Sequence, residues 1–529
     1  MTTDRSKTFD IEVFNHLFTS VAEEMGVAVQ QSSYSPNIKE RLDHSCAIFD
    51  RSGKMLAQAA HIPVHLGSMP ASVSAAIESY GKAKPASGDV LILNDPYMGG
   101  THLPDITTVS PVFVGRRTSK TQWGWVATRA HHADIGGMAP GSMPVAKELI
   151  QEGLIIPPIR IYDAGKIVHS TLSIILRNVR TPDERRGDLE AQVACQKIGI
   201  KRLANLAEKE GYKDFELTSK ELLNYGERIS RAAIKKIPNG SYEFKDMLDE
   251  DGTSTDPVPI HLTLHVRSSN WHLDFSKSSH QRSASINAVA AVTRSAAYYV
   301  LRCLLPDDVP TNSGLFRPVR FTLPLHSIVN ASPPVAVAAG NVETSQRIVD
   351  VIWGAISQAL PLQMPAASSG TMNNFAAGGV NPETNVPWTY YETIGGGHGG
   401  APDGPGLDAA QSHMTNTLNT PVESLEIAYP MQVVENSIRR GSGGKGVHRG
   451  GHGIIRRTRF LSPATVTIIS DRRLHSPWPA AGGEPGRPGR NQLERHGKRR
   501  KIPGKKVFDA MTGDVVRIET PGGGGWGKL

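Results

Sequence analysis

A chain of 529 residues, of which 39% are hydrophobic and 20% are charged, has the composition of a globular protein and is long enough for two or more domains. No apolar run reaches the roughly 18 to 20 residues of a membrane-spanning helix, and no apolar signal core follows the polar start, so we expect neither a membrane span nor a secretory signal. Three cysteines (Cys46, Cys195 and Cys303) lie far apart without a CxxC pair, which argues against disulfides and thiolate zinc sites and predicts a reducing, cytoplasmic location.

The formal net charge of +8 comes from one segment. Residues 485–506 contain nine Lys or Arg residues and one acid, Glu494, so the rest of the chain is formally neutral. A basic stretch of this kind is either a solvated loop or tail, or an interface with an acidic subunit. Because it lacks interleaved aromatic residues for base stacking, we expect no nucleic-acid binding.

The first part of the chain alternates between helical and strand patterns. A helix is predicted over residues 9–31, where apolar residues recur at three- and four-residue spacing, and another over residues 69–80. Residues 45–56 predict a strand, a turn and a second strand. Short apolar runs predict three further strands at residues 90–93, 111–114 and 124–128. A polar loop, residues 116–122, is predicted between the last two.

The remaining patterns change along the chain. Residues 182–226 are charged and helical in pattern, and we expect them to bridge two lobes. Alternating apolar and polar residues between 241 and 325 predict half-buried strands, with an Ala-rich helix at 288–304. From residue 370 onward the chain is dense in Gly and Pro and contains short strand-like runs.

These patterns together predict an α+β fold in two lobes. The N-terminal lobe, residues 1–230, mixes helices and strands and carries the polar motifs that are candidates for a metal site. The C-terminal lobe, residues 231–529, is β-rich and dense in Gly and Pro. The sequence contains no internal repeat of fixed period.

Two segments rich in His, Asp and Gly follow directly after predicted strands. The first, residues 94–105, contains His102 and Asp105 three positions apart. Imidazole nitrogens and carboxylate oxygens bind divalent metals such as Zn, Mn or Fe, and strand ends are rigid enough for side chains to converge. The second segment, residues 131–137, adds two imidazoles and a carboxylate that would bind the metal or orient a ligand, namely His131, His132 and Asp134.

The same residues also have a purely structural interpretation. Asp95–Pro96 and the Gly-Gly pairs are common in turns, and Gly99–Gly100 permits backbone shapes that a side chain would forbid. A third cluster, Glu40–Ser45, offers another carboxylate just before a strand. An HxxD spacing is weak by itself, and three clusters beside strands are only moderately specific, so the residues alone leave both interpretations open.

Two glycine-rich tracts, residues 395–400 and 441–446, satisfy the GxGxxG pattern, but neither opens an apolar helix. Lys445 is not followed by Ser or Thr, so the sequence lacks a phosphate-binding P-loop. We interpret these tracts as tight loops that line a cleft or a subunit contact.

His413 lies in a polar stretch and is a candidate to face the same cleft, with structural hydrogen bonding as the alternative. No GxSxG motif is present, and nothing around Cys46 marks it as a nucleophile.

The motifs of this chain, taken in their order along the sequence, resemble those of the hydantoinase B/oxoprolinase family. This family contains the B-type subunits of ATP-dependent N-methylhydantoinases and 5-oxoprolinases, and the acetone carboxylases are related to it. The resemblance runs nearly end to end, and it is specific because so many long motifs occur in order. Besides the three clusters above, it rests on the motifs Ala339–Arg347, Gly370–Asn374, Tyr391–Gly397, His413–Thr417, Arg440–Gly444 and Gly513–Gly527.

The resemblance implies one divalent metal, Zn²⁺, Mn²⁺ or Fe²⁺, with ligands at Asp43, His102, Asp105 and His131. Of the two adjacent histidines, the first is preferred as the ligand because the family varies more at the second position. The residues expected to assist catalysis, by orienting a ligand or moving a proton, are Asp134, His132 and His413. The resemblance also implies an A-type partner subunit that binds and cleaves ATP in a hetero-oligomer, which agrees with the missing P-loop.

The expected function is that of a metal-dependent subunit of an ATP-dependent cyclic amidohydrolase. The A-type subunit would phosphorylate the carbonyl oxygen of a lactam or hydantoin, of the 5-oxoproline or hydantoin type. Water whose pKa the metal lowers toward about 7 would then open the ring. Two alternatives stay open: a subunit of an acetone- or acetophenone-type ATP-dependent carboxylase, and a non-catalytic subunit whose His and Asp clusters only shape loops.

Overall fold

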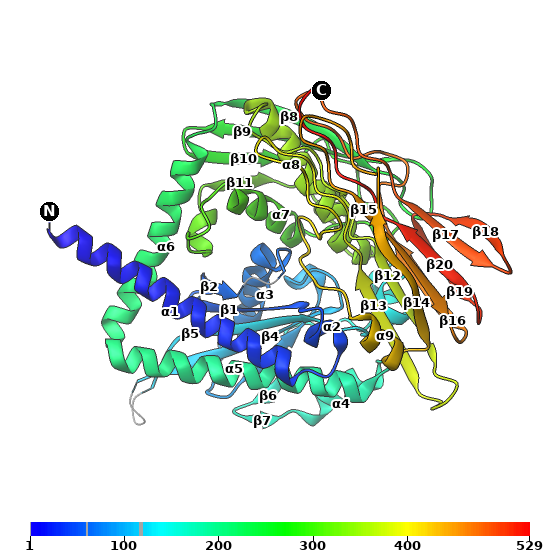
Figure 1. Ribbon diagram of the computed structural model, residues 1–529. Coiled ribbons are helices and arrows are strands. Elements are labelled where there is room, and N and C mark those ends of the chain that lie inside the picture. Colours follow the sequence, from blue (N-terminus) through cyan, green and yellow to red (C-terminus); the bar gives the residue numbers. More distant parts are fainter. Residues whose placement is uncertain (1, 60–61, 116–119) are drawn as a thin grey trace.

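The structure is a computed structural model that describes residues 2–59, 62–115 and 120–529; most of the predicted polar loop, residues 116–119, lies outside the described residues. Its largest sheet has seven strands in the order β2-β1-β5-β4-β3-β6-β7, with antiparallel neighbours (Figure 1). The strands are β1 (His44–Asp50), β2 (Met55–Ala59), β3 (Val90–Leu93), β4 (Asp105–Val114), β5 (Thr121–His131), β6 (Ile159–Asp163) and β7 (Lys166–Ile167).

Helices cover both faces of this sheet. α1 (Thr2–Ser32) and α5 (Pro182–Glu210) pack on one face, and α3 (His65–Ser79) packs on the other. Because successive side chains of a strand point to opposite faces, Ile48 of β1 joins the core under α1 and Phe49 joins the core under α3. The helix predicted over residues 9–31 is thus confirmed as α1, whereas the helix predicted to begin at residue 69 begins four residues earlier.

A second sheet, in the order β11-β10-β9-β8, packs against two helices in the middle of the chain. α8 lies on β8 and β9, and α7 connects it to α3 of the first layer (Figure 1). The elements are β8 (Gly240–Leu248), β9 (Val258–Arg267), β10 (Asn270–Asp274), β11 (Val319–Thr322), α7 (Ala290–Cys303) and α8 (Ser345–Ala359).

The helical stretch predicted over residues 182–226 is two helices, α5 and α6 (Tyr212–Ile234), which meet at Gly211 with a φ of 85°. The predicted lobe boundary at residue 231 falls inside α6, and the largest core cluster contains side chains from both sides of it, so the division into two lobes stays a prediction.

Among the described helices, none combines the length and the apolar composition needed to cross a bilayer. Three shorter helices are α2 (Pro36–Lys39), α4 (His169–Arg177) and α9 (Val422–Ala428).

The C-terminal part is built from two further sheets that enclose a third core cluster. One has the order β13-β12-β16-β19 and the other β14-β15-β20-β17-β18. The α+β class with a β-rich C-terminal region is therefore confirmed. The strands are β12 (Asn374–Val380), β13 (Pro387–Thr393), β14 (Met431–Arg439), β15 (Gly453–Phe460), β16 (Ala464–Ile469), β17 (Arg490–Arg495), β18 (Lys498–Ile502), β19 (Lys505–Ala510) and β20 (Val515–Glu519).

The glycine-rich tracts pack backbone against backbone. The N–H of Gly451 donates to the carbonyl of His398 at 2.8 Å, and the N–H of Gly523 donates to the carbonyl of Gly451 at 3.0 Å. A Cβ added at Gly397 would lie 1.9 Å from the carbonyl oxygen of Gly451, which leaves no room for any side chain. The tracts are tight loops, as predicted, and their glycines are required by this close approach rather than by a nucleotide.

The basic segment 485–506 is folded rather than a free tail. It contains the antiparallel pair β17 and β18 at the edge of the fourth sheet. Its Lys505, at the start of β19, is buried, and its Nζ lies 3.0 Å from the Oδ2 of Asp471. A role of the exposed hairpin as an interface with an acidic subunit stays a prediction.

Candidate metal centre

Two adjacent strands bring three candidate ligands together. β4 begins at Asp105, β5 ends at His131, and the antiparallel register pairs these two residues directly. His102 lies in the turn that precedes β4. All three side chains are buried. The two motifs that the sequence placed at strand ends therefore meet in space through these three residues.

The three side chains converge on one point. The Nε2 of His102 lies 3.0 Å from the Oδ1 of Asp105, and the Nδ1 of His131 lies 3.2 Å from each of these two atoms. Ligands that sit about 2.1 Å from one cation at right angles are about 3.0 Å apart, so the observed triangle has the dimensions of three neighbouring metal ligands. This donor set fits Zn, Mn or Fe.

Burial has the largest effect on the pKa of Asp105 and of His131, and it acts in opposite directions on the acid and on the imidazole. It lowers the pKa of His131 to about 3, so the ring is neutral and offers a lone pair. Burial would raise the pKa of Asp105, but the neighbouring histidines, His102 first, hold the pKa of this carboxyl well below its usual range. An ionised carboxylate beside a neutral imidazole is the protonation state that metal ligation requires.

The loop before β4 is fixed by its own polar and glycine residues. The Asn94 side chain donates to the carbonyl of Leu103 at 2.8 Å, and the hydroxyl of Thr101 donates to the Oδ2 of Asp105 at 2.6 Å. Gly99 has a φ of 90°, and a Cβ at Gly100 would lie 2.4 Å from the carbonyl oxygen of Asn94. The turn chemistry therefore positions the candidate ligands, and the structural and the metal-binding interpretations of these residues are compatible.

Asp43 lines the same small cavity but does not belong to the group of three whose ligand atoms lie within 4.8 Å of one another. Burial raises its pKa to about 7, although Arg41 acts in the opposite direction. Its backbone carbonyl accepts a hydrogen bond of 2.9 Å from the N–H of His131, which ties the two segments together. The assignment of Asp43 as a fourth ligand stays a prediction.

His65 is a member of the site that the sequence patterns missed. It begins α3, its Nδ1 lies 2.9 Å from the hydroxyl of Ser45, and its Nε2 lies 3.7 Å from the Oδ2 of Asp105. Burial lowers the pKa of this imidazole, and Asp105 opposes that effect. The helix was predicted to start after His65, and the sequence signal that could have found it is the pair of histidines four positions apart, His61 and His65, just before that helix.

The structure corrects the expected directions of His132 and Asp134. The Nε2 of His132 lies 2.9 Å from the Oε1 of Gln192 on α5, so this ring points toward the helix layer. The carboxylate of Asp134 accepts hydrogen bonds from the side chain of Arg180 at 2.7 Å and from the N–H of Gly136 at 3.2 Å. Because the loop after β5 turns these side chains toward α5 and Arg180, Asp134 does not orient a ligand histidine within the described part of the chain.

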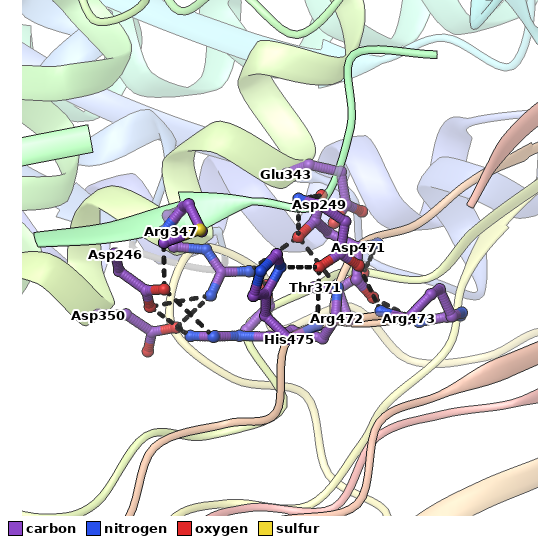
Figure 2. Close-up of polar contacts among 12 residues, drawn as sticks. Asp246, Asp249, Glu343, Arg347, Asp350, Thr371, Asp471, Arg472, Arg473 and His475 are labelled. Carbon is purple, nitrogen blue, oxygen red and sulfur yellow. Dashed lines mark hydrogen bonds and ion pairs between the residues drawn. The ribbon is translucent and has the colours of Figure 1, made fainter. Parts of the chain in front are cut away.

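His413 is also directed elsewhere. Its Nε2 lies 3.1 Å from the Oδ1 of Asp350, whereas its chain neighbour Met414 lines the cavity beside the candidate ligands. Asp350 belongs to a buried ionic network in which Arg347 and Arg472 approach it at 3.6 and 2.8 Å (Figure 2). The alternative that His413 has a structural hydrogen-bonding role agrees with this placement.

The cavity beside the three candidate ligands is small, about 20 Å³, which is room for about one ion or water molecule. Its wall combines polar and apolar side chains from eight separate segments of the chain. Besides the residues described above, the wall includes Ile62, Val64, Asn341, Val342, Met372, Tyr391, Thr393 and Thr415.

Comparison with known proteins finds one family and relatives that match nearly the whole of this chain. The profile of the family described as Hydantoinase B/oxoprolinase matches residues 7–529. The chain is 42% identical to an uncharacterised protein of Methanocaldococcus jannaschii, over 98% of this chain and 90% of that protein. It is 32% identical to the putative B-type subunit of a D-/L-hydantoinase of a Pseudomonas species, over 96% and 88%. It is 37% identical to 5-oxoprolinase 1 of Arabidopsis thaliana, but spans only 42% of that protein's length.

Two solved structures share the fold. The ATP-dependent caprolactamase of Pseudomonas jessenii superposes with a TM-score of 0.90 and 26% identity, over 98% of this chain and 91% of that chain. A nucleotide-free acetone carboxylase superposes with a TM-score of 0.89 and 20% identity, over 97% and 75%. At the latter identity the likeness concerns the fold alone.

Proposed function

Because the chain belongs to the hydantoinase B/oxoprolinase family, we propose that it is the metal-dependent subunit of an ATP-dependent enzyme that opens a cyclic amide. The observation that carries this proposal is the convergence of His102 Nε2, Asp105 Oδ1 and His131 Nδ1 within 4.8 Å. One relative is named as a hydantoinase component and another as a caprolactamase, and these names support a lactam or hydantoin ring as the substrate class.

The residues of the site have separate tasks. When bound there, a divalent cation would supply Lewis acidity for a carbonyl or a water molecule near neutral pH. His102, Asp105 and His131 would hold the cation, and the hydroxyl of Thr101 fixes the second oxygen of Asp105. The buried wall of the cavity keeps bulk water away, which strengthens electrostatic interactions inside it.

We also propose that an A-type partner subunit supplies the ATP-dependent step in a cytoplasmic hetero-oligomer. The partner would transfer a phosphoryl group to the carbonyl oxygen of the ring, and this chain would receive the activated substrate. Three observations support this: the sequence lacks a P-loop, one relative is named as the B-type component of a hydantoinase, and more than half of the Arabidopsis 5-oxoprolinase lies outside the matched region.

The test combines metal analysis with a coupled activity assay. The chain is purified with its A-type subunit and supplied with ATP and 5-oxoproline, hydantoin or caprolactam, and ring opening and ADP are measured together. We expect ring opening of at least one cyclic amide, and loss of both bound metal and ring opening in His102→Ala. Consumption of a ketone with bicarbonate instead would identify a carboxylase, and metal content unchanged by His102→Ala would show that these clusters only shape loops.

A further inference from the structure

Three of the sequence motifs supply residues of the cavity wall, and each also contributes one buried side chain to a series of contacts that begins at His131. The nearest is Tyr391 of β13, whose ring stacks on the imidazole of His131 with centroids 4.5 Å apart and an interplanar angle of 15°. The other two side chains, Asn374 and Glu343, continue away from the site.

Tyr391 is anchored through its hydroxyl. The O–H of Tyr391 donates to the Oδ1 of Asn374 at 2.7 Å. The side-chain amide of Asn374 donates in turn to the Oε1 of Glu343 at 2.8 Å and to the carbonyl of Ile469 at 2.9 Å. Asn374 thus uses both ends of its amide, which fixes its orientation and, through it, the plane of the tyrosine ring.

Glu343 connects this chain of contacts to the ionic network in Figure 2. It lies in the π-helical turn Gly340–Thr344, and its Oε1 also accepts from the N–H of Met372 at 3.2 Å. The neighbouring Thr371 accepts a hydrogen bond of 3.0 Å from the N–H of Asp471, whose carboxylate is held by Arg347 at 3.0 Å. The support behind Tyr391 is therefore made of buried groups that are themselves fixed.

Among the residues that the structure describes, no hydrogen bond to its second ring nitrogen supports the His131 ring. A metal-bound histidine usually donates its second ring nitrogen to a carboxylate, a carbonyl or water, which sets the rotation of the ring. Within the described residues, the Nε2 of His131 is buried without a hydrogen-bond partner. An aromatic ring stacked parallel to the imidazole restricts the same rotation from its face.

We propose that Tyr391 is a positioning residue that sets the plane of the His131 ring for metal binding, and that Asn374 and Glu343 hold Tyr391 in place. The inference deepens the proposed function and depends on it, since it assumes that His131 is a ligand. It also assigns a common task to three motifs that are far apart in the sequence.

The structure offers a matched control in the preceding residue. Tyr390 lies on the same strand, but its side chain points to the opposite face, where it belongs to the third core cluster. Its hydroxyl donates to the Oε2 of Glu392 at 3.0 Å. A general loss of stability would follow from changing either tyrosine, whereas an effect on the metal should follow only from Tyr391.

The experiment measures the affinity of the purified full-length chain for Zn²⁺ and Co²⁺ by competition with a chromophoric chelator, together with the visible spectrum of the Co²⁺ form. We expect Tyr391→Leu to weaken binding by roughly 10- to 100-fold and to change the Co²⁺ spectrum. Tyr391→Phe, which keeps the ring but loses its anchor, should weaken binding less. Tyr390→Phe should leave affinity and spectrum unchanged.

Thermal unfolding of each variant establishes that it is folded before the titration. A folded Tyr391→Leu variant with the affinity and Co²⁺ spectrum of the parent would overturn the inference and leave the proposed function intact. If Tyr391→Leu does not fold, Tyr391→Phe decides the question through the spectrum, which must then differ from the parent. A parent chain that binds neither metal would overturn the proposed function and this inference together.

Discussion

His131 and His132 are adjacent in the chain, yet their imidazoles contact different layers of the protein. The Nδ1 of His131 lies 3.2 Å from the Oδ1 of Asp105, in the candidate metal centre. The Nε2 of His132 lies 2.9 Å from the Oε1 of Gln192, in the helix that covers the sheet. The two positions therefore allow a test of the metal site in which charge, residue type and local sequence are all matched.

Substitution of each histidine by alanine should separate metal binding from stability. We expect His131→Ala to lose the bound metal, because one of three converging ligand atoms is removed. We expect His132→Ala to keep the metal and to lower the free energy of unfolding by roughly 1–3 kcal/mol, because it leaves Gln192 without its buried partner. Metal content by plasma mass spectrometry and urea unfolding provide the two measurements. Loss of metal in His132→Ala with retention in His131→Ala would reverse the assignment.

The pair formed by Asp134 and Arg180 is predicted to support the fold and not the metal. Asp134 is buried, and the guanidinium of Arg180 donates to it at 2.7 Å. Arg180→Gln should cost roughly 1–3 kcal/mol of unfolding free energy, because a buried carboxylate loses a charged partner, while the metal content stays that of the parent. Arg186→Gln, at an exposed position of α5, is the control for loss of one positive charge. A metal-depleted but equally stable Arg180→Gln protein would contradict this assignment.

The buried ionic network in Figure 2 should be far more costly to break than a surface pair. Arg347 is fully buried and lies 3.0 Å from both Asp246 and Asp471. Arg347→Gln should lower the free energy of unfolding by roughly 3–5 kcal/mol, since the buried network loses one of its cations and Asp246 and Asp471 keep only Arg472 and Lys505 as charged partners. The comparison is Arg202→Gln, which breaks the solvent-exposed pair with Glu24 and should leave the unfolding midpoint nearly unchanged. Equal midpoints for the two variants would contradict the expectation.

The sequence patterns placed His102, Asp105 and His131 beside predicted strands, and the family resemblance selected them as ligands. Apolar runs located β4 and β5, and a hairpin register brings the start of one strand to the end of the next, as it does for Asp105 and His131. The pattern could not predict which way the chain turns after β5. The side chains of His132 and Asp134 were therefore expected in the site although they point to α5 and Arg180.

Other parts of the site were beyond local patterns for a physical reason. His65 faces Asp105 from the first turn of α3, which begins four residues before its predicted start. The start of a helix depends on tertiary contacts as well as on the sequence, so local patterns did not place His65 in the helix. Arg347 and Asp471 are 124 residues apart, so no spacing rule links them. Charged side chains usually lie on the surface of a protein, whereas this fold buries Arg347 and Asp471 and pairs them in its interior.

Glu152 gives a pH-dependent prediction away from the metal centre. Its carboxyl group is fully buried, and its Oε1 accepts hydrogen bonds from the N–H groups of Val337 and Ala338 at 3.0 and 2.8 Å. Burial nevertheless raises its pKa from 4.5 to about 8. Between these two values the folded protein holds a proton that the unfolded chain releases, so the contribution of Glu152 to stability falls as the pH rises through this window.

Glu152→Gln keeps the acceptor oxygen and removes the titration. The unfolding temperature of this variant should therefore exceed that of the parent at about pH 8, and the difference should shrink toward about pH 5. The expected change is at most about 1.4 kcal/mol per pH unit within the window. Differential scanning fluorimetry at a series of pH values measures it, with Glu383→Gln in the exposed β12–β13 turn as the control for loss of a carboxyl group. A difference that is constant with pH, or largest in acid, would mean that Glu152 is ionised in the folded protein, and its unpaired Oε2 would then need a cation or water as a partner.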